Sequence, residues 1–118
     1  MQSKIRTDLG TISIEKEVIA RIAGLSAMEC YGVVGMAAKS LRDGLVHLLK
    51  IESLSKGVVL ESLDNGELVI DLHIIVEYGT NLAAIADTLQ GNVRYTVEEH
   101  VGMRVREVNI IIEGVRTE

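Results

Sequence analysis

The feature that most constrains the fold is the run of residues 67–78, where side chains alternate strictly. Large aliphatic side chains share one side: Leu68, Ile70, Leu72, Ile74 and Val76. The other side is half-polar: Val69, Asp71, His73, Ile75 and Glu77. A period of two is typical of a β-strand with one buried face. The chain is therefore expected to contain a sheet that is covered on one side and half-polar on the other.

A hairpin is predicted immediately before this strand. The step Asn65-Gly66 separates residues 58–63 from residues 67–78, and both stretches are rich in aliphatic side chains. Asn and Gly tolerate the positive φ angles that a tight hairpin turn requires. The two stretches are therefore expected to pair as antiparallel strands.

Two amphipathic helices are predicted from a period near 3.6. In residues 15–30 the aliphatic positions recur at helical spacing: Val18, Ile22 and Leu25, with Ile19, Ala23 and Ser26 beside them. Residues 82–101 carry a second stripe: Leu82, Ile85, Ala86, Leu89, Val93 and Val97. Thr80 or Asn81 can cap this second helix, and Gly102 ends it. Gly32 is placed to follow the first helix in the left-handed conformation.

The remaining segments complete the predicted order β, α, an open segment, β, β, α, β. Residues 1–8 are expected to be a polar lead-in, and residues 9–14 and 103–115 are expected to be strands. Residues 37–54 fit either a helix or a loop, because leucines at helical spacing are interrupted by Gly44: Leu41, Leu45, Leu48 and Leu49. The predicted fold is α+β, with residues 9–118 forming one domain. It has two layers: a mostly antiparallel sheet of about four strands, with two long helices on one face.

Charge and composition exclude several classes of function. The formal net charge is −5, with 12 Lys+Arg against 17 Asp+Glu, whereas binding to phosphate backbones depends on basic patches. No apolar run approaches the roughly 20 residues of a membrane helix, and the first residues lack the apolar segment of a signal peptide. Cys30 is the single cysteine. The sequence therefore predicts a cytoplasmic protein without direct membrane insertion.

The order of these segments resembles the bacterial alkaline-shock (envelope stress response) family. That family opens with a Gly-x-Ile/Val-x-Ile/Val strand, a helix and a Gly-Val-x-Gly turn, and here the run is LGTISIEKEVIARIAGLSAMECYGVVGMA. The second half is also similar: an alternating strand ending in Tyr78-Gly79, a long helix, a break at Val101-Gly102 and a strand with the sequence VNIII. The resemblance covers residues 9–115.

The resemblance implies a non-enzymatic, cytosolic protein linked to cell-envelope homeostasis in Gram-positive bacteria. It implies that some relatives are held at the membrane by a separate membrane-spanning partner, and that some self-assemble. This chain lacks the long polar tails of larger members and looks more like short members whose genes neighbour a fatty-acid kinase. An accessory role beside such a kinase is therefore an alternative function.

Three groups of polar or reactive residues are candidates for chemistry. Asp71, His73 and Glu77 share one strand face, which a metal site could use only with a further ligand from another element. Glu98, Glu99 and His100 are consecutive, so they do not share a helix face. Cys30 has no basic neighbour in sequence that would activate its thiol. We therefore predict no catalytic residue, no metal, no cofactor and no small-molecule substrate.

The segment Gly32-Val33-Val34-Gly35 leaves alternatives open. A G-x-x-G loop after a β-α pair is similar to that of a KH domain, where it clamps RNA, although both intervening residues are valines here. The segment could instead be a turn that tucks its valines inward. It could also form an exposed patch that docks a partner. The candidate contacts for a partner or a second copy are Val33, Val34, Met36, Val69 and Ile75.

The first functional hypothesis is therefore a self-associating interaction or scaffold protein without catalytic activity. Its partner would be another copy of the chain, a membrane-anchored protein or a kinase. Association with the membrane would then occur only through that partner.

Overall fold

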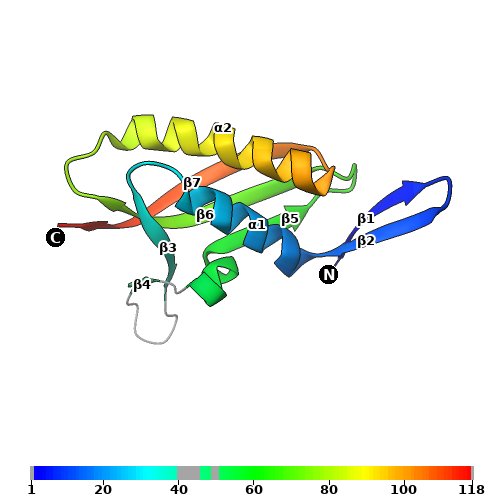
Figure 1. The fold of residues 1–118 in the computed structure, drawn as a ribbon, viewed down its shortest axis with the longest axis horizontal. Coiled ribbons are helices and arrows are strands. Elements are labelled where there is room, and N and C mark those ends of the chain that lie inside the picture. Colours follow the sequence, from blue (N-terminus) through cyan, green and yellow to red (C-terminus); the bar gives the residue numbers. More distant parts are fainter. Residues whose placement is uncertain (1, 40–45, 49–50, 118) are drawn as a thin grey trace.

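The protein has an α+β fold built from two sheets and two long helices (Figure 1). The computed structural model describes residues 2–39, 46–48 and 51–117. Its elements in chain order are β1 (Gln2–Thr7), β2 (Gly10–Glu15), α1 (Lys16–Met28), β3 (Val33–Lys39), β4 (Val46–Leu48), the 3₁₀ helix η1 (Ile51–Gly57), β5 (Val58–Ser62), β6 (Leu68–Glu77), α2 (Leu82–Val101) and β7 (Val105–Arg116).

Strand β6 is the centre of the five-stranded sheet. It pairs in parallel with β7 along its whole length, from Leu68 opposite Val105 to Glu77 opposite Arg116. On its other edge it pairs antiparallel with β5 and then with β3, and β4 continues the sheet beyond β3. The predicted hairpin is thus confirmed, with Gly66 at φ 87° in its turn.

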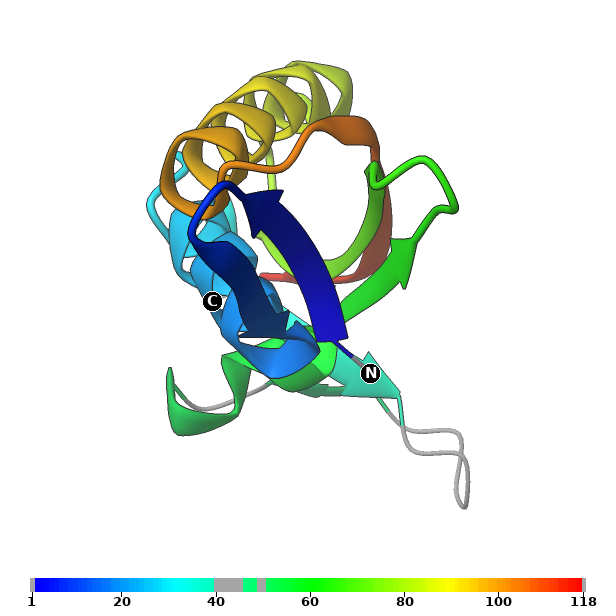
Figure 2. The ribbon, with the colours of Figure 1, turned by 90° about the vertical axis from the view of Figure 1, so that its right-hand side faces the viewer.

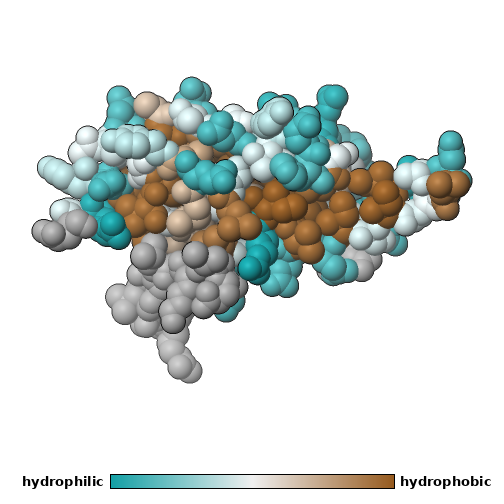
Figure 3. Space-filling view, viewed as in Figure 1, coloured by the Kyte–Doolittle hydropathy of each residue, from teal (hydrophilic) through white to brown (hydrophobic). Residues whose placement is uncertain are grey.

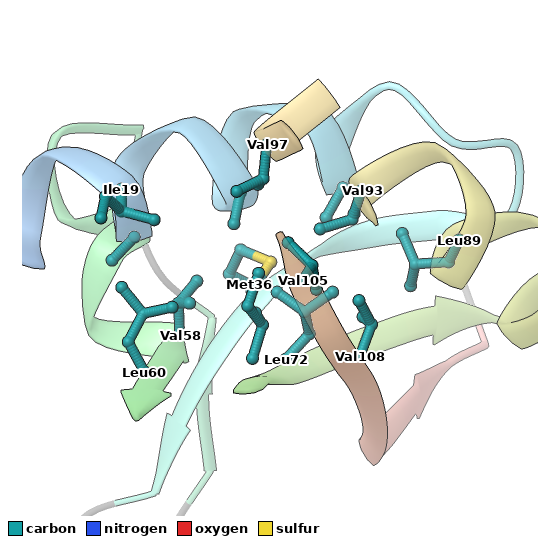
Figure 4. Close-up of a cluster of buried hydrophobic side chains, with 14 of the residues drawn as sticks. Ile19, Met36, Val58, Leu60, Leu72, Leu89, Val93, Val97, Val105 and Val108 are labelled. Carbon is teal, nitrogen blue, oxygen red and sulfur yellow. The ribbon is translucent and has the colours of Figure 1, made fainter. Parts of the chain in front are cut away.

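Both helices lie on one face of this sheet (Figure 2). The core between the layers is almost wholly aliphatic, as the close-up of ten of its labelled side chains shows (Figure 4). The predicted alternation of β6 is confirmed: its five large aliphatic side chains facing the helices are buried, and the intervening side chains are half-buried or exposed. The opposite face of the sheet carries no helix of the described chain.

Helix α2 begins and ends where the sequence predicts. The Asn81 side chain accepts a hydrogen bond from the Ala84 N–H at 3.0 Å, which satisfies one of the free donors of the first turn. Gly102 adopts a left-handed φ of 80° and its N–H donates to the Glu98 carbonyl. Of the predicted stripe, Leu82 is exposed, whereas Ile85, Leu89, Val93 and Val97 are buried together with Val101.

Residues 2–7, which the sequence places in a polar lead-in, form strand β1. This strand pairs antiparallel with β2, with Ile5 opposite Ile12, and the two strands form an arm that projects from the body (Figure 1). Serine and isoleucine at positions 3 and 5 alternate with the charged side chains of Lys4 and Arg6. That alternation is the signal of a strand with one apolar face, which the overall polarity of the segment concealed.

The apolar residues predicted to form one stripe on α1 lie on two different sides of the helix, one buried and one exposed. The row buried in the core consists of small side chains beside one isoleucine: Ile19, Ala20, Ala23, Gly24 and Ala27. Val18 and Leu25 face outward, and Ile22 is half-buried. The small residues let α1 approach η1 closely, since a Cβ added at Gly24 would lie 3.2 Å from the Leu54 Cβ.

Residues 37–54, for which the sequence fits either a helix or a loop, begin as a β-strand. β3 runs on to Lys39 and pairs with β4, and η1 follows. Leu48 lies in β4, whereas Leu41, Leu45 and Leu49 are outside the described residues. Gly32 does have a positive φ, of 88°, but it lies in the turn before β3 and not directly after α1, whose C-terminal cap is Glu29.

Candidate interaction surface

The polar side chains on the open face of the sheet pair with one another across β6 and β7. Asn109 donates to the Asp71 carboxylate at 2.8 Å, and His73 Nδ1 lies 2.7 Å from Glu113 Oε2. Glu77, the third predicted member of this group, is exposed. Within the described ranges no three His, Cys, Asp or Glu side chains come together as a metal site would require. These pairs tie the two strands together.

The polar residues at the end of α2 hold the backbone in place. The Glu98 carboxylate accepts a hydrogen bond from the Val105 N–H at 2.9 Å, which fixes the start of β7. His100 Nδ1 lies 2.9 Å from the carbonyl of Thr96, one turn earlier. Glu99 is exposed. The three side chains therefore diverge, as their consecutive positions predict.

Cys30 is buried at the end of the first helical segment. Its sulfur lies 3.9 Å from the Ser26 carbonyl oxygen and 3.5 Å from the side-chain nitrogen Nδ2 of Asn92. The thiol therefore lies between α1 and α2, in contact with both. A buried thiol in such a place behaves as a small packing side chain.

One hollow of the described surface, of about 370 Å³, lies between α2 and β7 and includes Gln90 and Arg94, whose side chains have partners. Gln90 donates to the Val108 carbonyl at 2.9 Å, and Arg94 lies 3.6 Å from Glu98. Among the described residues no buried side-chain nitrogen or oxygen lacks a hydrogen-bond partner. In that part of the chain, no buried polar group is thus left to select a ligand.

The Gly32–Gly35 segment does not form an exposed loop. Val33 and Gly35 belong to β3, opposite Val76 and Ile75, and Gly35 is buried. A Cβ at Gly32 would collide with the side chain of Ile85, so the backbone packs tightly against α2. A loop that clamps nucleotides needs an accessible backbone. The KH-like interpretation therefore loses the feature on which it depended.

The five predicted contact residues fall in three different environments. Val33 and Val34 are half-buried in β3, and Val69 and Ile75 are half-buried on the open face of the sheet. Met36 is 0% exposed and lies in the core. Met36 can therefore contribute nothing to an exposed patch, and its burial follows from its position opposite Ile74 on the face of the sheet that carries the helices.

A further apolar surface of the described residues lies along the arm and α1. We call it the apolar strip and define it by Leu9, Ile12, Val18 and Leu25, whereas the half-buried Ile22 packs against the core. Leu9 is 100% exposed, Ile12 51%, Val18 49% and Leu25 44%. Figure 3 shows hydrophobic surface over the middle of the molecule, where α1 lies, and over the base of the arm, and again at the tip of the arm. The signal in the sequence is that α1 carries apolar side chains on two opposite faces, one small and one large.

Comparison with known proteins identifies the family. Residues 4–117 match the family model of the alkaline shock proteins, which is described as having a cell envelope-related function. The chain belongs to the alkaline shock protein family. This confirms the resemblance that the order of strands, helices and turns predicts.

Related proteins match nearly the whole chain. The chain is 44% identical over 117 residues to the YloU protein of Bacillus subtilis (strain 168), and the match covers 98% of this chain and 97% of YloU. It is 35% identical to Spy1614 of Streptococcus pyogenes serotype M6, over 98% and 96% of the two chains. A stress response regulator gls24 homolog of S. pyogenes serotype M3 is 28% identical, over 92% of this chain and 60% of the relative.

No solved structure matches the chain. In the part of the chain that the structure describes, neither helix is long and apolar enough to cross a lipid bilayer.

Proposed function

We propose that this member of the alkaline shock protein family is a self-associating interaction protein without catalytic activity, acting in maintenance of the bacterial envelope or in its stress response. The proposal rests on the contrast between polar side chains that have partners and apolar side chains that are exposed. The candidate catalytic and metal-binding groups are engaged in holding strands and helix ends, whereas large apolar side chains stay exposed along the apolar strip. Such exposed apolar surface marks contacts with other macromolecules.

The family description and the names of relatives support a role connected with the cell envelope and with stress. The description of the family names a cell envelope-related function, and one relative is named as a homolog of a stress response regulator. A protein of this family that works by contact would act in the cytoplasm. It would reach the membrane only through a partner, either a membrane-anchored protein or a kinase that acts on fatty acids. It would need no cofactor and no small-molecule substrate.

Purification of a tagged chain from cells that also express the untagged chain tests this function. We expect the untagged copy to be recovered with the tagged one, together with envelope or fatty-acid enzymes, as identified by mass spectrometry. An unrelated tagged protein of the same size is the control. Light scattering of the purified chain gives an independent measurement. A strict monomer at tens of micromolar, with no protein recovered above the control, would contradict the proposal.

A further inference from the structure

The open face of the five-stranded sheet, opposite the two helices, is partly apolar although no helix of the described residues covers it (Figure 2). Val59 lies on this face and is 52% exposed. The side chains of Val69, Ile75 and Ile111 lie there too and are half-buried. Strands β6 and β7 are parallel, and parallel strands mostly belong to sheets that are covered on both faces. The open face therefore has the character of a surface that receives a further layer.

The same face carries much of the negative charge of the protein. Strands β5, β6 and β7 place five carboxylates on it: Glu61, Asp71, Glu77, Glu107 and Glu113. The same three strands contain two guanidinium groups, Arg106 at the bulge beside Glu107 and Arg116 opposite Glu77. The whole chain has 17 Asp+Glu and 12 Lys+Arg, so 12 acidic and 10 basic residues remain elsewhere. The excess of acidic groups is therefore concentrated on these strands.

The carboxylates lie directly beside the apolar side chains. Val69 has Glu61 opposite it on β5 and Glu107 opposite it on β7. Val59 lies opposite Asp71. Side chains that are directly opposite on one face of a sheet are about 5 Å apart at their Cβ atoms. Any molecule that covers Val69 must therefore also meet the two carboxylates on either side of it.

This pattern restricts the molecules that can cover the open face. A second copy laid on it through the same face would place carboxylates against carboxylates. Nucleic acids and anionic lipids are disfavoured for the same reason. An extended segment laid flat on the face would bury backbone groups without partners, whereas a helix satisfies its own. The complementary occupant is a helix whose apolar stripe is bordered by Lys or Arg.

We propose that the open face docks a basic amphipathic helix of a different protein. The helix lies along β6, with its apolar stripe on Val69 and Ile75 and its basic side chains beside Glu61 and Glu107. At about 3.3 Å per residue, β6 spans about 26 Å from Val69 to Glu77, which is the length of about 18 helical residues. The inference goes beyond the self-association proposed above and does not depend on it.

A set of synthetic peptides tests the chemistry of the occupant. Each has about 18 residues and one leucine stripe at helical spacing, which lysines border in one peptide and glutamates in another. We expect the lysine peptide to bind in the micromolar range and the glutamate peptide at least about a hundredfold more weakly. A scrambled lysine peptide, which keeps the charge but lacks the stripe, should bind about tenfold more weakly. Calorimetry at about 0.15 M ionic strength measures the three dissociation constants.

A matched pair of charge variants locates the binding face. Glu61→Gln combined with Glu107→Gln removes the two carboxylates beside Val69, and we expect the lysine peptide to bind about tenfold more weakly. Glu17→Gln combined with Glu99→Gln removes the same number of charges from exposed positions on α1 and α2. This control should leave the affinity within about twofold, because charges farther away than the Debye length are screened.

A second matched pair tests the apolar contact. Val59→Lys places a positive charge on the open face, whereas Val115→Lys makes the same change at a valine of similar exposure, 46%. Val115 lies opposite the buried Val76 and so belongs to the other face of the sheet. We expect Val59→Lys to weaken binding of the lysine peptide at least about tenfold and Val115→Lys to change it about threefold or less. Circular dichroism checks the fold of all variants.

Amide chemical shifts show where the lysine peptide binds, and we expect changes on β5, β6 and β7, including Val69 and Ile75. Equal affinity for the lysine and glutamate peptides, or shifts confined to α1 and α2, would overturn the inference. Shifts of the same amides with the concentration of the chain alone would assign the open face to a second copy and would also overturn it. Light scattering decides self-association separately. A monomer that binds the lysine peptide keeps this inference without self-association, and a chain that assembles but ignores the peptide does the reverse.

Discussion

Helix α2 buries large side chains and helix α1 buries small ones, although both lie on the same face of one sheet. In α2 the buried row is Ile85, Leu89, Val93, Val97 and Val101. In α1 it is Ile19 with four Ala and Gly residues and Ser26, and the larger Val18 and Leu25 face outward. A helix that only covers a core has its largest apolar side chains inside. The arrangement of α1 therefore indicates a helix with a second surface to cover.

The difference also explains how close the two helices come to their neighbours. A Cβ at Gly24 of α1 would lie 3.2 Å from the Leu54 Cβ of η1, whereas a Cβ at Gly91 of α2 would meet nothing within 4 Å. The small side chains on the buried side of α1 allow the helix to pack close to η1, and the larger Val18 and Leu25 lie at the surface. In α2 the large side chains fill the space between helix and sheet.

The largest effect is expected from truncating the buried row of α2. Leu89→Ala removes a fully buried side chain and leaves a cavity, so we expect the free energy of unfolding to fall by about 3 kcal/mol. Val18→Ala in α1 is the matched control and should change it by about 0.5 kcal/mol or less. Urea unfolding at low protein concentration measures both, because assembly would add stability. Equal losses would show that the outward row of α1 is packed as tightly as the core.

The next effect concerns the close approach of α1. Gly24→Leu would push a large side chain into Leu54, and we expect a loss of about 2 kcal/mol from overpacking. Gly91→Ala, in the open part of α2, should raise stability by about 0.5 to 1 kcal/mol through helix propensity alone. Thermal and urea unfolding of the two variants give the comparison. A stabilising Gly24→Leu would mean that α1 can move away from η1 without cost.

The sequence predicts the two-layer α+β fold well, because several local signals agree with one another. Strict alternation in β6, the Asn65-Gly66 turn and the cap at Asn81 each specify structure through a few neighbouring residues. Two features escape prediction. Polar residues dominate residues 1–8 and hide the alternation of β1, and α1 carries apolar side chains on two opposite sides. Which of two apolar rows faces the core depends on partners distant in sequence, here Leu54 of η1.

The candidate site is predicted less well than the fold. Val69 and Ile75 lie on the open sheet face as their alternation with the core residues requires, and they remain candidates for contact. Met36 does not join Val33 and Val34 at the surface, because it lies opposite the buried Ile74 on the face of the sheet that carries the helices. A surface that joins the arm to α1 arises only when β1 pairs with β2, so its residues cannot be grouped before that pairing is known.

A third effect distinguishes how the two helices begin. The Asn81 side chain caps α2, whereas the Glu15 side chain makes no cap hydrogen bond to α1. Asn81→Ala should therefore lower stability by about 1 kcal/mol, and Asn81→Ser, which keeps an acceptor, should retain most of it. Hydrogen exchange of the Ala84 amide gives a local readout that global unfolding lacks. No faster exchange in Asn81→Ala would mean that packing alone holds the start of α2.

The smallest effect is expected at the other end of α2, where Glu98 has two neighbours. Glu98 accepts a hydrogen bond from the Val105 N–H at 2.9 Å and lies 3.6 Å from the exposed Arg94. Arg94→Ala removes only a surface ion pair and should cost about 0.3 kcal/mol, diminishing further at high salt. Glu98→Ala also leaves the Val105 N–H without its acceptor, so it should cost more, about 1 kcal/mol, with little dependence on salt. If the two substitutions cost the same and respond equally to salt, the link to β7 contributes nothing. Glu98 would then be an exposed charge at a helix end, and α2 would rest on its buried row alone.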